Sequence, residues 1–91
     1  MLKVRFLKSF EKDYKRIKKR GCDVAKLQHI IEMLRNCQPL PEKNNDHALS
    51  GNYIGYRECH IEPDWLLIYK IEKDILLLTL TRTGTHSDLF K

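Results

Sequence analysis

Hydrophobic residues recur at helical spacing in the first half of the chain. Phe10, Tyr14 and Ile17 lie three and four positions apart, and basic residues fill most of the positions between them. Ser9 is a favoured capping residue, and Gly21 is a favoured stop. The pattern predicts an amphipathic, basic helix that begins near Phe10 and ends at Gly21.

A second helix is predicted directly after the first. Asp23 can cap it, apolar residues repeat at helical spacing from Val24 to Cys37, and Pro39 cannot continue it. Because only a short turn separates the two helices, we expect them to form a helical hairpin. Residues 39–46 have the composition of an extended loop, which leads out of the helical half.

The other apolar segments are typical of strands. Leu2, Val4 and Phe6 alternate with basic residues. Three longer segments follow the loop, at residues 56–61, 65–71 and 75–83. Because only short turns separate these three, they favour an antiparallel meander. We therefore expect an α+β fold in one domain of residues 1–91, with an antiparallel sheet packed against the N-terminal helical hairpin. The opposite face of the sheet is then free for function.

Positive charge is concentrated near the N-terminus. The net charge is +5, and residues 1–20 hold nine Lys or Arg against two acids. Four lysines lie on the predicted first helix: Lys12, Lys15, Lys18 and Lys19. An anionic partner fits this charge, whether a nucleic acid, an acidic membrane surface or an acidic protein. A solvated helix face would have the same composition.

Composition places the chain among ordinary globular proteins. Hydrophobic residues make up 42% and charged residues 32% of the sequence. The three cysteines are an odd number without CxxC spacing, which indicates reduced thiols and a cytoplasmic protein. The apolar runs are far shorter than the roughly 20 residues that span a bilayer, so we expect no membrane partner.

The chemistry is predicted to lie in the C-terminal half. His47, His60 and His86 each lie close to a predicted turn, in the same half as Asp64 and Arg82. If these side chains converge, they can cleave RNA without a metal, since they supply a base for the ribose 2′-hydroxyl, a cation for the phosphorane and an acid for the departing oxygen. Imidazole suits both proton transfers because its pKa of about 6.5 lies near neutral pH. Ordinary surface histidines are the alternative.

Arg82 breaks the pattern of its predicted strand. Strict alternation puts it on the same face as Leu76, Leu78 and Leu80, so the cation must lie at the sheet rim or beyond a bulge. A guanidinium is well suited to bind two phosphate oxygens at once.

Other residues and chemistries leave alternatives open. Trp65 and Phe90 can stack on bases, although aromatic side chains are more often part of the core. Zinc bound by the histidines and Asp64 is a competing interpretation, but their spacing matches no compact zinc pattern, so we expect neither a metal nor a cofactor. No nucleotide-binding loop or nucleophile elbow is present.

Three C-terminal motifs resemble a known family. Residues 46–51, 55–69 and 82–90 are similar to those of the YafQ branch of the RelE toxins, within the RelE/ParE superfamily. The basic first helix, the second helix and the exit at residues 38–41 are similar as well, so the resemblance covers nearly the whole chain.

The resemblance implies a β-α-α-β-β-β microbial RNase fold and an endoribonuclease that cuts messenger RNA in the ribosomal A site. It also implies inhibition by a cognate antitoxin, which we expect to be DinJ-like and a DNA-binding dimer. The family's functional positions fall on seven residues: His47, His60, Asp64, Trp65, Arg82, His86 and Phe90.

We assign roles to these residues as a hypothesis. His86 is the general acid, Asp64 or His60 is the base, Arg82 clamps the transition state, and His47 positions phosphate or shares the proton transfer. Two other functions remain open: a ParE-like toxin that cuts nothing, and a basic RNA-binding module. A ParE-like toxin does not need the catalytic residue types, and an RNA-binding module needs the lysines but not the histidines.

Overall fold

The computed structural model describes residues 1–90. The helices are α1 (Lys8–Lys19), α2 (Val24–Arg35) and α3 (His86–Leu89). The strands are β1 (Lys3–Phe6), β2 (His47–Ala48), β3 (Arg57–Glu62), β4 (Trp65–Glu72) and β5 (Leu77–Gly84). Three short 3₁₀ helices are η1 (Glu42–Asn44), η2 (Gly51–Tyr53) and η3 (Lys73–Ile75).

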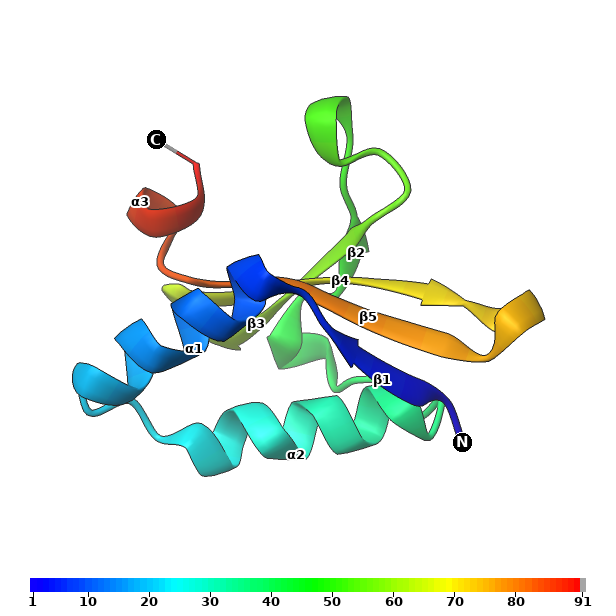
Figure 1. The fold of residues 1–91 in the computed structure, drawn as a ribbon, viewed down its shortest axis with the longest axis horizontal. Coiled ribbons are helices and arrows are strands. Elements are labelled where there is room, and N and C mark those ends of the chain that lie inside the picture. Colours follow the sequence, from blue (N-terminus) through cyan, green and yellow to red (C-terminus); the bar gives the residue numbers. More distant parts are fainter. Residues whose placement is uncertain (91) are drawn as a thin grey trace.

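The strands form one sheet in the order β1-β5-β4-β3-β2. The predicted antiparallel meander is confirmed in β3, β4 and β5, and the helical hairpin packs on one face, as Figure 1 shows. The expectation of purely antiparallel pairing is wrong at β1, which is parallel to β5. Parallel strands need a long connection rather than a hairpin, and most of the chain lies between these two. The short strand β2 was not predicted.

The main core lies between the helical hairpin and the sheet. Phe10 and Ile17 of α1 and Leu27, Ile30 and Leu34 of α2 are buried there. They pack with sheet residues that point to the same side: Cys59, Leu67, Tyr69, Leu78 and Leu80. Full burial of one such aliphatic side chain contributes about 1.5–3 kcal/mol to folding, so this layer fixes the sheet that carries the site.

The helix boundaries differ from the prediction at two ends. Helix α1 begins at Lys8 after Leu7, and Ser9 is inside its first turn rather than the cap. The Ser9 hydroxyl instead donates to the Thr81 carbonyl of β5 at 2.7 Å. Helix α2 has the predicted cap, since the Asp23 side chain accepts from the Ala25 amide at 3.0 Å. It ends at Arg35, before the expected stop, because Cys37 adopts a positive φ of 56°.

Gly21 has the predicted role at the end of α1. Its φ is +82°, a conformation that disfavours side chains, and its amide donates to the Lys18 carbonyl at 3.1 Å. The next amide, of Cys22, donates to the Ile17 carbonyl at 3.1 Å. This close turn brings α2 directly back across the sheet. Within residues 1–90, no helix is long and apolar enough to cross a membrane.

Candidate active site

The functional side chains gather on the sheet face opposite the helical hairpin, which we call the far face. Paired residues share a face, and the register pairs His60 with Leu66, Glu58 with Ile68 and Ile68 with Arg82. Leu66 and Ile68 form a second, smaller core on this face with Leu89 of α3. The far face is therefore defined by Glu58, His60, Leu66, Ile68 and Arg82.

A bulge in β5 turns Arg82 toward the far face, as predicted. Tyr69 of β4 pairs with Leu80, but the preceding Ile68 pairs with Arg82, so Thr81 is an extra residue in β5. Without this residue, Arg82 would share the face of Leu80 and enter the main core. The bulge keeps the guanidinium at the edge of the sheet, where its side chain is 26% exposed.

The three predicted histidines lie in a row on three different elements. The ring centroid of His60 in β3 is 6.4 Å from that of His47 and 5.8 Å from that of His86. His47 comes from the short strand β2, which pairs it with Glu58, and His86 opens α3. The three histidines therefore lie together, and the unpredicted β2 and α3 bring His47 and His86 to His60. The fourth histidine, His29, is exposed on α2, away from this row.

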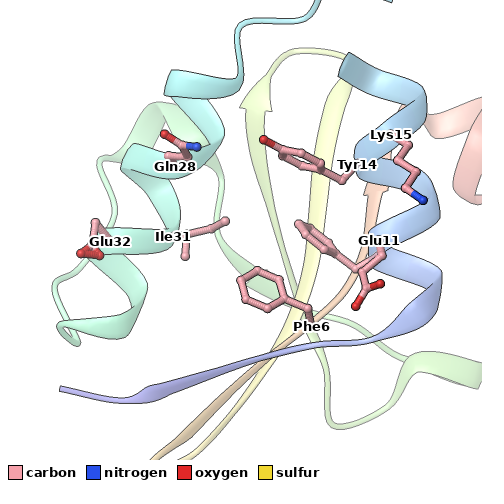
Figure 2. Close-up of a pocket in the computed structure, with 8 residues that line it drawn as sticks. Phe6, Glu11, Tyr14, Lys15, Gln28, Ile31 and Glu32 are labelled. Atoms are coloured by element: carbon pink, nitrogen blue, oxygen red, sulfur yellow. The ribbon is translucent and has the colours of Figure 1, made fainter. Parts of the chain in front are cut away.

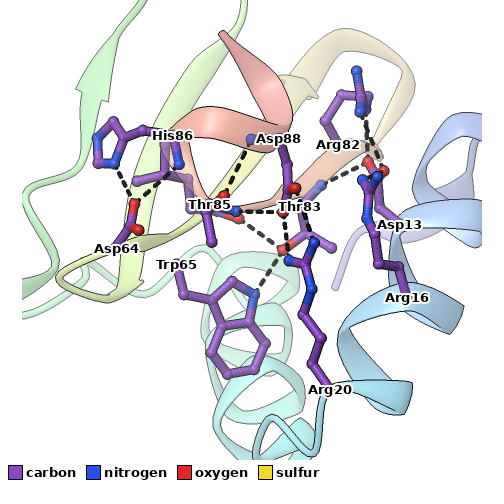
Figure 3. A network of polar contacts seen from close by, with 11 residues as sticks. Asp13, Arg16, Arg20, Asp64, Trp65, Arg82, Thr83, Thr85, His86 and Asp88 are labelled. Carbon is purple, nitrogen blue, oxygen red and sulfur yellow. Dashed lines mark hydrogen bonds and ion pairs between the residues drawn. The ribbon is translucent and has the colours of Figure 1, made fainter. Parts of the chain in front are cut away.

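Asp64 binds His86 in two ways. Its Oδ1 accepts the His86 backbone amide at 3.0 Å and lies 2.6 Å from His86 Nδ1 (Figure 3). The backbone hydrogen bond and then the side-chain hydrogen bond lower the pKa of Asp64, so the carboxylate remains charged. A proton held on Nδ1 by this carboxylate leaves Nε2 available to exchange protons with a substrate. The pair has the arrangement of an acid–base group with its orienting partner.

Glu58 is a site residue that the sequence analysis missed. It is 6% exposed, and its Oε1 lies 3.4 Å from His47 Nε2 and 3.7 Å from His60 Nε2. A buried carboxylate between two imidazoles can fix the orientation of both rings. Alternation along β3 could have identified Glu58, since it lies two residues before His60 and so shares its face.

Helix α3 is held by a network of polar contacts that reaches α1. Thr85 Oγ1 accepts the Asp88 amide at 3.1 Å, and Asp88 Oδ2 accepts the Thr85 amide at 2.9 Å, which forms a capping box. The Arg20 guanidinium donates to both Asp88 oxygens, at 2.6 and 3.0 Å (Figure 3). A Cβ on Gly84 would come within 2.8 Å of Asp88, so the glycine permits this approach.

Asp88→Asn should lower stability in a pH-dependent way. The Arg20 guanidinium is the main cause that holds the pKa of Asp88 well below its usual value. A depressed folded pKa gives stability that is present above the unfolded pKa of about 3.9 and is lost as the pH falls below it. Asparagine can still accept the Thr85 amide but loses the charged contact with Arg20, so we expect a fall in Tm of up to about 8 °C for a domain of this size.

Thermal melts measure this effect. We expect the difference in Tm between wild type and Asp88→Asn to be largest near neutral pH and to shrink below pH of about 4. Glu32→Gln is the matched control, since Glu32 forms a more exposed, longer ion pair with Arg35 at 3.6 Å. An equal difference at all pH values would show that charge on Asp88 does not hold α3.

Trp65 is misplaced among the substrate-binding residues. It is 4% exposed in the main core, and its indole nitrogen donates to Thr83 Oγ1 at 2.9 Å. The Thr83 hydroxyl in turn donates to the Leu66 carbonyl at 2.7 Å. Strand alternation directs Trp65 toward the helical hairpin, so the indole cannot stack on RNA here. Its hydrogen bond to Thr83 instead stabilises the pairing of β4 with β5.

The other predicted substrate-binding residues are exposed. Phe90 is 44% exposed and contacts the Tyr53 ring edge-on, with centroids 6.1 Å apart. All four predicted lysines of α1 are exposed: Lys12, Lys15, Lys18 and Lys19. Among residues 1–90, no three His, Cys, Asp or Glu side chains are arranged to hold a metal ion.

A separate apolar groove lies between α1, α2 and β1, on the side of the helical hairpin. It has a volume of about 600 Å³ and is shown in Figure 2. Phe6, Phe10, Tyr14 and Ile31 line it. Lys15 is the one predicted site residue on its rim, so the groove is distinct from the histidine row.

Comparisons with known proteins place the chain in a family. The model of the family described as "Bacterial toxin of type II toxin-antitoxin system, YafQ" matches residues 2–91. The mRNA interferase toxin YafQ of Escherichia coli is 46% identical over 82 residues, which cover 89% of this chain and 87% of that protein.

Solved structures agree with this sequence match. YafQ in the Escherichia coli DinJ-YafQ complex is 41% identical and covers 100% of both chains with a TM-score of 0.90. A metal-bound toxin from Helicobacter pylori is 43% identical and covers 99% of this chain and 100% of that one with a TM-score of 0.93. The fold, the histidine row and the match over residues 2–91 lead to one conclusion: this chain belongs to the YafQ family of toxins from type II toxin–antitoxin systems.

Proposed function

We propose that this protein is an mRNA interferase that cuts translated messenger RNA by metal-independent general acid–base catalysis. The observation that carries the proposal is the row of His47, His60 and His86 on the face that also presents Arg82. The family supports the same activity, since its Escherichia coli relative is named an mRNA interferase toxin. A positioned acid or base contributes about 10²–10⁴-fold to such a reaction.

His86 is the general acid in this mechanism, and His60 is the base. Asp64 is a weaker candidate for the base because its hydrogen bonds to His86 lower its pKa. His60 takes the proton from the ribose 2′-hydroxyl, whose oxygen attacks the neighbouring phosphorus. His86 donates a proton to the departing 5′-oxygen. The products are a 2′,3′-cyclic phosphate and a 5′-hydroxyl.

Arg82 and His47 complete the site. The guanidinium of Arg82 neutralises charge that develops on the phosphorane oxygens. His47 positions phosphate, with Glu58 holding it and His60 in place. Phe90 stacks on a base at the C-terminal edge, since its ring is exposed beside Tyr53.

A DinJ-like antitoxin is the proposed partner. The Escherichia coli relative was solved in a complex with DinJ, and this chain matches it over its whole length. We infer that the chain acts as one domain of residues 1–91 in the cytoplasm, where ribosomes translate messenger RNA. The exposed lysines of α1 bind ribosomal RNA phosphates in this proposal, with a salt-dependent affinity.

In this proposal the ribosome holds the RNA strand in the geometry that cleavage requires. The sequence has neither paired RNP aromatics nor a GXXG loop with which to hold a flexible strand in line for attack. A ribosome presents the codon in a fixed path. Purified protein should therefore cut a translated transcript at least about 10²-fold faster than the same transcript without a start codon.

Sequencing of 5′ ends in a reconstituted translation system tests this expectation. The cuts should be in reading frame and should weaken when Lys12, Lys15, Lys18 and Lys19 are changed together to glutamine. Lys43→Gln and Lys73→Gln, two exposed lysines outside α1, control for the loss of charge alone. Equal cleavage of both transcripts would leave a free ribonuclease in place of a ribosome-dependent one.

A chelator arm tests metal independence in the same system. The Helicobacter pylori relative was solved as a metal-bound toxin, so this arm is needed for this chain too. The chelator must bind zinc and copper selectively, because ribosomes need Mg²⁺. Unchanged cleavage with cyclic-phosphate ends supports the proposal, whereas loss in the chelator and recovery with Zn²⁺ would refute metal independence.

A further inference from the structure

A buried carboxylate in α1 lies beside the proposed catalytic arginine. Asp13 is 3% exposed and accepts from four groups, two of which belong to Arg82. We propose that Asp13 is a positioning residue, which fixes the Arg82 guanidinium in the orientation that receives the scissile phosphate. This inference rests on the proposed role of Arg82.

The contacts with Asp13 use only one edge of the guanidinium. Arg82 Nε donates to Asp13 Oδ2 at 2.6 Å, and Nη2 donates to Oδ1 at 3.2 Å (Figure 3). These bonds occupy one side of the planar fork. Of the five N–H donors, the two on Nη1 and one on Nη2 remain, and they can bind two phosphate oxygens.

The rest of the surroundings fix the carboxylate itself. Its Oδ2 also accepts the Thr83 amide at 3.1 Å, and its Oδ1 accepts Arg16 Nη2 at 2.5 Å. Asp13 is thus tied to the strand residue that follows Arg82. An arginine has several rotatable bonds, and a bidentate partner with fixed coordinates selects one arrangement of them.

Charge in the cluster favours an anion. One carboxylate from Asp13 and two guanidinium groups from Arg16 and Arg82 leave a net charge of +1. Arg16 thereby offsets the negative charge that would otherwise cancel that of Arg82. Hydrogen bonding to Asp13 is the main cause that raises the pKa of Arg82, whose guanidinium is charged at any pH at which the protein is folded.

The test compares steady-state cleavage by Asp13→Asn and Arg82→Ala. Asparagine keeps the shape of Asp13, but its amide group cannot accept both Arg82 bonds. Because a misplacement of about 1 Å in a reacting group costs about 10²-fold, we expect kcat to fall by about 10²-fold with KM nearly unchanged. Asp13→Asn in the Arg82→Ala background should cost less than about 3-fold more, since residues that act as a unit are not additive.

Controls separate positioning from folding. Glu11→Gln makes the same change of charge on an exposed residue of the same helix and should leave kcat unchanged. Thermal melts and antitoxin binding report whether each variant folds. Asp13→Glu is the second variant, because it keeps the charge but moves the carboxylate by one methylene, and it should also lower kcat.

Four outcomes would overturn the inference. They are full activity of a folded Asp13→Asn or Asp13→Glu protein, additive losses in the double variant, loss of fold in both Asp13 variants, and full activity of Arg82→Ala. Full activity of Arg82→Ala is the one outcome that would also remove Arg82 from the proposed mechanism. Full activity of a folded Asp13 variant would leave that mechanism intact.

Discussion

His86→Ala is expected to lower RNA cleavage by at least about 10²-fold while the protein stays folded. The imidazole is 53% exposed and contributes to neither core, so its loss should not affect packing. The change removes the proposed general acid and the imidazole partner of Asp64, which keeps its hydrogen bond from the backbone amide of residue 86. Loss of growth arrest on expression and loss of cleavage in the translation system both measure the effect.

His29→Ala is the matched control for this prediction. His29 is an exposed histidine on α2, on the other side of the sheet, and its replacement should leave cleavage unchanged. RNA and ribosome binding by His86→Ala should also remain, because the lysines of α1 are intact. A folded His86→Ala protein with wild-type cleavage would exclude His86 as the acid.

Trp65→Ala should destabilise the protein by about 3–5 kcal/mol. The indole is buried in the main core, and its removal leaves a cavity and takes a donor from Thr83. A domain of this kind has a total stability of about 5–15 kcal/mol, so the loss is a large part of the whole. Thermal melting should show a fall in Tm of more than about 10 °C.

Two further variants define the cause of that loss. Trp65→Phe keeps an aromatic ring but lacks the N–H donor, so its Tm should lie between those of wild type and Trp65→Ala. Ile54→Ala removes a large apolar side chain that is 78% exposed, and it should change stability by no more than about 0.5 kcal/mol. An unchanged Tm with weakened RNA cleavage in Trp65→Ala would place the indole at the RNA instead.

The position of Arg82 shows what alternation along a strand can predict. A cation in register with three leucines conflicts with burial, and the conflict itself pointed to the sheet rim or to a bulge. The structure has the bulge at Thr81. The two helices and the three main strands were predictable for the same reason, since their periodic patterns extend over many residues.

Elements without periodicity were not predictable from the sequence in this way. Strand β2 has two residues and α3 has four, too few for a repeat of either kind. Thr85 and Asp88 did contain the spacing of a capping box, which is a weak signal without a helix behind it. These two elements place His47 and His86, so the sequence identified both residues without predicting where they lie.

Trp65 and Glu58 were misjudged for a common reason. Residue type alone suggests that a glutamate faces solvent, and it leaves open whether a tryptophan faces a ligand or the core. The burial of each side chain depends on which face of the sheet is covered. Predicting it requires knowing that the helical hairpin covers the face of Trp65, while β2 and α3 border the other face.

The parallel pairing of β1 with β5 sets the order in which a newly made copy can become active. The first strand has no partner until the last one is synthesised, and Asp13 meets Arg82 across 69 positions of sequence. Contacts this distant form late in folding. While the C-terminal residues are still inside the exit tunnel, neither the sheet edge nor the site can be complete. A nascent copy therefore cannot complete its site before β5 and α3 have left the tunnel.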